Sequence, residues 1–122
     1  MAKRRCYLPA NEASIVTLLM ERGADINAVD KHGCTLLHSA ASHGNEPVMS
    51  LLLEHGADVN TRNVFGFTPL LCAREASIVK LLVKRGGADI NVVDKYGSTL
   101  LHFAVTEGNE SVAAFWMISS MT

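Results

Sequence analysis

The feature that most constrains the fold of this chain is that its sequence repeats. Glu12–Gly23 (EASIVTLLMERG) returns as Glu75–Gly86 (EASIVKLLVKRG) with nine of twelve residues unchanged. Ala24–His38 returns as Ala88–His102 with twelve of fifteen unchanged. Within this long repeat, a Gly-Ala-Asp-x-Asn motif recurs after 33 residues, which reveals a shorter period. A period of this length is typical of stacked units, none of which covers its own apolar face alone.

Each short unit is predicted to form two helices joined by a turn. In the best-preserved unit, Thr35 is a suitable N-cap, because its hydroxyl can accept a bond from a free backbone N–H. The second helix places Val48, Leu51 and Leu52 on one face, and Gly56 is a suitable left-handed cap. We expect four such second helices to bury the same apolar face, formed by Ile15/Leu18/Leu19, Val48/Leu51/Leu52, Ile78/Leu81/Leu82 and Val112/Phe115/Trp116.

These motifs resemble the ankyrin repeat, whose pattern runs D-x-x-G-x-T-P-L-H-x-A. Asp30–Ala40 matches it with Leu36 in place of the proline, and Asn63–Ala73 with Leu71 in place of the histidine. Asp94–Ala104 matches it as well. The resemblance implies an all-α ankyrin-repeat solenoid of stacked helix-turn-helix units, with hairpin-like turns, here called fingers, projecting at right angles. It also implies binding of other proteins, without catalysis and without a cofactor.

The resemblance covers roughly residues 11–115, and we expect a single ankyrin-repeat domain over 1–122. The expected units are a partial repeat at 1–29, a repeat at 30–62, a shortened repeat at 63–93 and an incomplete terminal repeat at 94–122. The shortened unit lacks three residues before its second helix, so a helix or its loop should be about one turn shorter. We expect a degraded first helix in the first unit around Arg5–Ala10, with Pro9 working against it. Gly87 is an extra residue that a left-handed cap can absorb.

The C-terminal segment is unusually apolar for the end of a solenoid. Phe115, Trp116, Met117 and Ile118 face different ways on a helix, and no Gly-Ala-Asp turn follows them. A terminal unit needs a polar outer face, so some of these side chains are exposed unless another segment or chain covers them. The segment indicates either a fragment of a longer array, which the argument favours, or a surface that binds a partner.

Composition excludes several classes of function. A net charge of −1 gives no bulk attraction to nucleic acid or an anionic membrane, and no apolar run is long enough for a membrane-spanning helix or a signal peptide. Cys6, Cys34 and Cys72 are odd in number and far apart in sequence, which favours free thiols in a reducing compartment. We therefore expect an intracellular protein, cytoplasmic or nuclear.

The histidines are expected to be structural. His38 and His102 recur 64 residues apart, and each is predicted to bridge a threonine hydroxyl and a backbone group rather than to act as a general base. His32, Cys34, His38 and His43 lie close in sequence but lack the paired spacing of a zinc site. We therefore expect no metal and no catalytic residues.

Two asparagines carry a candidate modification. The resemblance implies that Asn27 and Asn60, each preceded by L-x5-D-[IV], are candidate sites of asparaginyl hydroxylation. The alternative is turn chemistry, in which Asp and Asn side chains bond local backbone N–H groups.

In ankyrin repeats the finger tips and the adjoining first-helix surface meet the partner. The partner-binding residues carried over from the family are Lys31, His32, Val64, Phe65, Lys95 and Tyr96 at the tips, and Cys34, Ser42, His43, Phe67, Ser98, Thr106 and Glu107 beside them. One ring at each tip predicts a row of rings about 10 Å apart, on the spacing of packed helices. The alternative is that each ring folds back onto the neighbouring finger.

The function predicted from these features is a non-catalytic protein–protein interaction module, which binds its partner through the finger tips and the concave first-helix face. The alternative is a structural spacer, or a self-associating segment of a larger ankyrin-repeat protein, with the contact made through the C-terminal apolar stretch. An enzyme would need a pocket with convergent polar groups, for which the sequence offers no candidate.

Overall fold

The computed structural model describes residues 13–120, and this part of the chain is helical, with one isolated bridge between Val93 and Thr99. The helices are α1 (Ala13–Glu21), α2 (Leu36–His43), α3 (Glu46–Glu54), α4 (Pro69–Cys72), α5 (Ala76–Lys84), α6 (Leu100–Glu107) and α7 (Glu110–Ser120). None of these helices is both long enough and apolar enough to cross a membrane.

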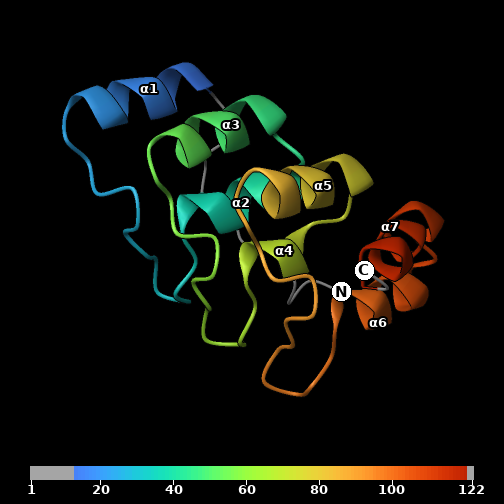
Figure 1. Ribbon diagram of the computed structural model, residues 1–122. Helices are drawn as coiled ribbons and strands as arrows, with labels where there is room; N and C mark the ends of the chain where they lie inside the picture. The colour runs from blue at the N-terminus through green and yellow to red at the C-terminus, as the bar shows by residue number, and fades with distance from the viewer. Residues whose placement is uncertain (1–12, 121–122) are drawn as a thin grey trace.

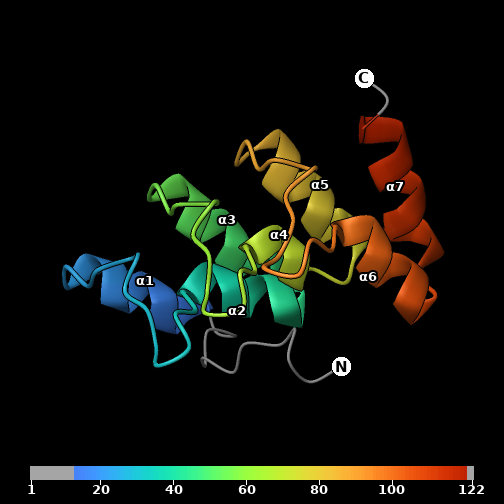
Figure 2. The ribbon, with the colours of Figure 1, turned by 90° about the horizontal axis from the view of Figure 1, so that it is seen from below.

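The helices form two layers. The first helices α2, α4 and α6 pack on one another, and each also packs on the second helix of its own hairpin, α3, α5 or α7. In the second layer α1 packs on α3, and α5 packs on α7 (Figures 1 and 2). Each hairpin therefore contacts mainly the hairpins before and after it, and the predicted all-α solenoid is confirmed.

The best-preserved hairpin begins at the N-cap that the sequence indicated. Thr35 caps α2 by accepting a bond from the His38 N–H, and the His38 side chain completes the capping box. Gly44 ends α2 in the left-handed region at φ 68°. Asn45 then caps α3 by accepting a bond from the Val48 N–H. Helix α6 has the same type of capping box and a left-handed glycine at its end.

The shortened unit loses its residues from its first helix. Helix α4 has 4 residues, whereas α2 and α6 have 8 each. Thr68 occupies the N-cap, but its side chain makes no capping bond, and its buried Oγ1 has no hydrogen-bond partner among residues 13–120. The reason lies at Leu71, which stands where α2 has His38 and cannot complete a capping box.

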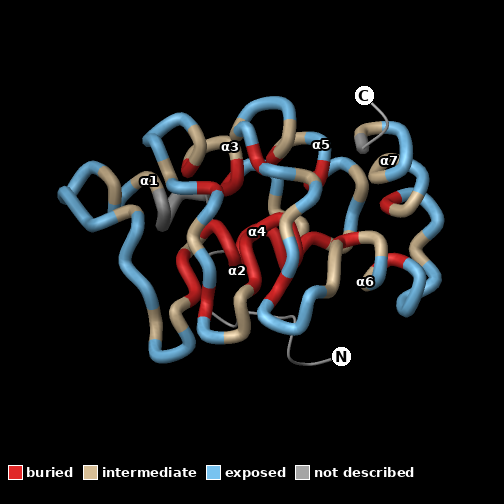
Figure 3. The backbone as a smooth tube through the Cα atoms, turned by 60° about the horizontal axis from the view of Figure 1, so that its bottom comes forward, coloured by how far each residue is buried: buried red, intermediate tan, exposed pale blue. Residues whose placement is uncertain are grey.

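The core lies between the two layers in the middle of the stack (Figure 3). The predicted stripes of α3 and α5 are confirmed at their central positions, since Val48, Leu52, Ile78 and Leu82 are all 0% exposed. The prediction missed two further core residues, Met49 and Val79, which are also fully buried.

The stripes of the outer second helices are less buried than predicted. In α1, Leu18 and Leu19 are 50% and 40% exposed, and the side chain of Ile15 lies outside the described residues. In α7, Val112 is buried, while Phe115 and Trp116 are half-buried. The cause is position, because an outer helix has a neighbouring second helix on one side only.

The extra glycine is absorbed at the end of α5. Gly87 takes the left-handed conformation with φ 70°, and Ala88 donates a backbone bond to the Leu82 carbonyl. Gly86 stays outside the left-handed region, and its N–H continues the helical bonding by donating to the Leu82 carbonyl at 3.0 Å. The degraded helix expected around Arg5–Ala10 lies outside the described residues.

Candidate functional site

Three fingers project from the same side of the stack, at residues 24–35, 57–68 and 88–99 (Figure 1). One side chain organises each tip: Asp30, Asn63 or Asp94. Its Oδ1 accepts bonds of 2.8–3.0 Å from the backbone N–H groups two and four residues further along. Each tip is thus held by its own Asp or Asn side chain and is formed before any partner arrives.

Neighbouring fingers are also bonded to each other. Val64 N–H donates to the His32 carbonyl at 2.9 Å, and Lys95 N–H donates to the Phe65 carbonyl at 3.4 Å. The second contact is so close that a Cβ at Gly66 would lie 2.6 Å from the Lys95 nitrogen. The three tips therefore form one continuous edge of fixed backbone.

The aromatic side chains of the fingers behave in two different ways. The His32 and Phe65 rings stack with centroids 6.4 Å apart, and Phe65 lies 6.0 Å from Phe67. Phe67 in turn meets Phe103 edge to face at 5.7 Å. Tyr96 instead is 75% exposed, with the Lys95 Nζ 5.3 Å from its ring centroid. Phe65 thus folds back toward its neighbours, whereas Tyr96 faces solvent.

His38 bridges two successive units. Its Nδ1 accepts from the Thr35 N–H at 3.1 Å, and its Nε2 donates to the Phe67 carbonyl at 2.8 Å. Full burial of the ring lowers the pKa of His38 below 6.5, although the Phe67 carbonyl and the Asp30 carboxylate oppose the shift. His38 is therefore the neutral structural bridge that the sequence predicted.

The repeated hairpins and fingers match a known family. The sequence fits the family described as ankyrin repeats (3 copies) over residues 6–94 and 61–117. The chain belongs to the ankyrin repeat family. Ankyrin repeats are generally protein–protein interaction modules.

Curated relatives carry the same repeats in much longer proteins. The nuclear factor NF-kappa-B p105 subunit of Gallus gallus is 35% identical over 109 residues, which are 84% of this chain and 11% of that protein. The neurogenic locus notch homolog protein 1 of Xenopus laevis is 32% identical over 105 residues, 84% of this chain and 4% of that protein. The E3 ubiquitin-protein ligase KEG of Arabidopsis thaliana is 35% identical over 93 residues, 74% of this chain and 6% of that protein. This ankyrin chain thus spans 4–11% of the length of these relatives.

Three of the residues carried over from the ankyrin pattern do not lie at the surface. Cys34, Ser42 and Phe67 are only 3%, 8% and 5% exposed, so their expected contact with a partner is wrong for this structure. The reason is that they face a neighbouring unit: Asn63 Nδ2 donates to the Cys34 sulfur at 3.4 Å, and Phe67 packs against Phe103.

The other carried-over residues are accessible to different degrees. Lys31, His32, Val64, Lys95, Tyr96, His43, Thr106 and Glu107 are exposed, while Phe65 and Ser98 are half-buried. On α6, Glu107 pairs with Arg74 at 3.7 Å, and at the end of α2 the His43 Nδ1 bonds the Ser39 carbonyl at 2.8 Å.

The cysteines differ from the sequence prediction. Cys72 is buried and is not part of a disulfide, but Cys34 is disulfide-bonded, so the expectation of free thiols is wrong at Cys34. Cys6 lies outside the described residues. Because disulfides are typical of oxidising compartments, the cysteine count gives no support to the expected intracellular location.

The two candidate hydroxylation sites differ in their surroundings. The Asn27 side chain joins two fingers, since its Oδ1 accepts from the Asp58 N–H at 3.1 Å. Asn60 is exposed, and its N–H donates to Asp58 Oδ1 at 2.9 Å. Turn chemistry thus accounts for the Asp58 side chain, whereas the Asn27 side chain bonds the neighbouring finger. Within the part of the chain that the structure describes, no three His, Cys, Asp or Glu side chains are placed to hold a metal ion.

Proposed function

We propose that this ankyrin domain binds its partner protein through the finger edge, defined as Lys31, His32, Val64, Phe65, Lys95 and Tyr96, together with the concave first-helix face beside it. The observation that carries the proposal is the pair of apolar side chains held outward on this edge. Val64 and Tyr96 are 55% and 75% exposed, although the backbone beneath them is bonded from finger to finger. Exposed aromatic groups on a rigid frame are typical of binding hot spots.

Rigidity supports the proposal energetically. The tip backbones are already fixed by Asp30, Asn63 and Asp94, and by bonds between fingers. Flexible loops must become ordered when they bind, which costs free energy. A preformed edge avoids this cost.

The charges on the edge indicate the chemistry of the partner. The Asp30 and Asp94 side chains are turned to their own backbone N–H groups, and Asp94 is only 6% exposed. Lys31 and Lys95 remain exposed at the tips. The edge therefore suits a partner segment that presents carboxylates together with an apolar side chain.

A peptide library displayed on phage, enriched against the intact chain, tests this proposal. We expect selected peptides to be rich in Asp or Glu, and we expect Val64→Ser with Tyr96→Ser to weaken their binding by roughly tenfold or more, as hot-spot truncation does. Both side chains are exposed, so the double variant keeps its fold. The matched control is Met117→Ser in α7, a side chain 53% exposed and outside the edge.

Equal binding by the double variant and the unmodified chain would contradict the finger edge as the contact. Hydrogen exchange with and without peptide adds a direct measurement, since the backbone amides of 31–33, 64–66 and 95–97 should become protected. Protection confined to other segments would also refute the proposal.

A further inference from the structure

The outward face of α5 carries a row of exposed cations. Helix α5 lies in the layer of second helices, away from the finger tips (Figure 3). Lys80 and Lys84 lie one turn apart on the side of α5 opposite its buried residues, and both are exposed. Arg85 follows at the end of the helix, where its Nη1 donates to Ser50 Oγ of α3 at 3.2 Å. We call Lys80, Lys84 and Arg85 the cationic ridge.

The cationic ridge has no negative charge beside it. None of its three side chains forms an ion pair within residues 13–120. Lys80 Nζ lies 5.9 Å from the centroid of the Phe115 ring of α7, which holds the ammonium group without neutralising it. Two lysines four residues apart on a helix repel each other and weaken the helix. The negative C-terminal end of α5 accounts for Lys84, in the last turn, but not for Lys80.

The other second helices show that the fold does not need these two lysines. The stretches that contain α1 and α5 share nine of twelve residues, and two of their three differences fall on the ridge. The residues at the two places are Thr17 and Glu21 in α1, Ser50 and Glu54 in α3, Lys80 and Lys84 in α5, and Ala114 and Ile118 in α7. Of these four helices, α5 alone is cationic at both places.

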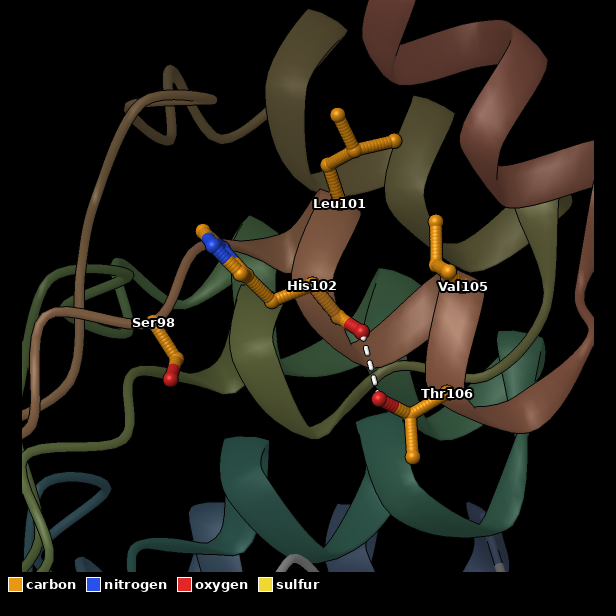
Figure 4. A pocket seen from close by; sticks show the side chains of 5 residues that line it. All are labelled: Ser98, Leu101, His102, Val105 and Thr106. Carbon is orange, nitrogen blue, oxygen red and sulfur yellow. Dashed lines mark hydrogen bonds between the residues drawn. The ribbon is translucent and has the colours of Figure 1, made fainter.

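An open hollow on α6 is less suited to an anionic ligand. Its volume is about 390 Å³, and it is lined by Ser98, Leu101, His102, Val105 and Thr106 (Figure 4). The Thr106 hydroxyl already donates to the His102 carbonyl at 2.9 Å. No lysine or arginine is among these lining residues, so the hollow lacks the charge that the ridge presents.

The surroundings of the ridge suit a narrow anionic ligand. Glu54 and Glu110 are exposed on the helices to either side, α3 and α7. A membrane surface or a nucleic acid would bring phosphates against these acids too, and the net charge of −1 gives no wider attraction. An acidic helix lying along α5 would meet the cations alone. Its carboxylates, one turn apart, would match Lys80 and Lys84 at a spacing of about 6 Å, the rise of four helical residues.

We infer that the cationic ridge binds an acidic helix of a partner protein, with carboxylates one helical turn apart. The ridge and the finger edge lie on different sides of the stack, so this site does not rest on the proposed finger-edge contact. Exposed ion pairs contribute little free energy each, so the affinity is modest and falls as the salt concentration rises.

An NMR titration of the intact, nitrogen-15-labelled chain tests the inference. The probe is an alanine-based helical peptide with glutamate at every fourth position, and its matched control has glutamine at those positions. At about 20 mM salt the glutamate peptide should shift the backbone amides of 77–86 saturably, and about 200 mM salt should weaken its binding severalfold. The glutamine peptide should cause no such shifts.

Lys80→Thr with Lys84→Glu gives α5 the two residues of α1, and it should weaken binding of the glutamate peptide by roughly tenfold. Arg22→Glu with Val105→Glu is the matched control, because it lowers the net charge by the same three units at exposed side chains outside the ridge. This control should bind the peptide as the unmodified chain does. Circular dichroism checks that both variants keep their fold.

Three results would overturn the inference. The first is the absence of saturable shifts at 77–86 with the glutamate peptide. The second is equal binding of the glutamate peptide by the ridge variant and the unmodified chain. The third is tighter binding to vesicles of phosphatidylcholine and phosphatidylserine than to the peptide, lost in the ridge variant, which would identify a membrane surface as the ligand instead.

Discussion

The His38 bridge allows a quantitative test of how the units are held together. His38→Leu introduces the residue found at the same place in α4, Leu71, and removes the ring's hydrogen bonds to the Thr35 N–H, the Thr35 hydroxyl and the Phe67 carbonyl. The hydroxyl can rotate toward another acceptor, so the cost comes mainly from the other two bonds. The Thr35 N–H, in a residue 2% exposed, loses its acceptor, and an unsatisfied buried donor costs about 1–3 kcal/mol. The Phe67 carbonyl keeps its 2.9 Å bond from the Asn63 N–H, so its loss is that of an ordinary hydrogen bond, about 1 kcal/mol.

The sum is about 2–4 kcal/mol, and the greater apolar burial of leucine moves the net loss toward about 2 kcal/mol. Urea unfolding followed by far-ultraviolet circular dichroism measures it, at a concentration low enough to keep the chains apart. The matched control is His102→Leu. Thr99 and His102 form the same capping box at the exposed end, where water replaces the lost bonds, so we expect a loss of less than about 1 kcal/mol. Equal losses in the two variants would refute the argument, because burial would then not decide the strength of the bridge.

Two further predictions follow from single positions. Burial lowers the pKa of His38 below 6.5, so the unfolded chain binds a proton more readily; its contribution to stability is present above pH 6.5 and is lost as pH falls toward the folded-state pKa. The urea midpoint should thus drop between about pH 7.5 and about pH 5.5 by more in the unmodified chain than in His38→Leu, and parallel drops would contradict this. Gly66→Ala should destabilise more than Gly23→Ala in thermal unfolding: both have φ of 79°, but the new Cβ would lie 2.6 Å from Lys95 N at Gly66 and would meet nothing within 4 Å at Gly23. Equal shifts would mean that the fingers are not in close approach.

The sequence predicted the fold because repetition, caps and apolar spacing are local signals that agree with one another. Thr35 caps α2 as expected, and Val48 and Leu52 lie in the core. Met49 was missed because the i, i+3, i+4 pattern describes a stripe, whereas a second helix packed between neighbours on both sides buries a wider face.

The candidate site was predicted less well, since exposure depends on what lies across the next unit. Cys34 and Phe67 occupy positions that the ankyrin pattern places beside the partner, yet here the neighbouring finger and α6 cover them. The direction of the Phe65 ring likewise depends on the nearby Phe67 and on His32, which lies in another part of the sequence. The disulfide at Cys34 could not be predicted because separation along a chain does not measure distance in space.

One signal was present in the sequence and was not used. Leu71 replaces the histidine of the pattern, so Thr68 lacks the imidazole that bonds the hydroxyl of Thr35. The unpaired Thr68 hydroxyl in the structure is the direct result.

Helix α4 has a consequence for the order in which the chain folds. Its four residues make little more than one turn, which includes a bond from Cys72 N–H to the Thr68 carbonyl at 3.3 Å, and a single turn cannot persist in water unaided. It takes its shape from contacts with α2, α5 and α6. The centre of the stack therefore becomes ordered only after, or together with, the hairpins on both sides. The hairpins before and after α4 therefore become ordered jointly with α4, which is too short to form alone.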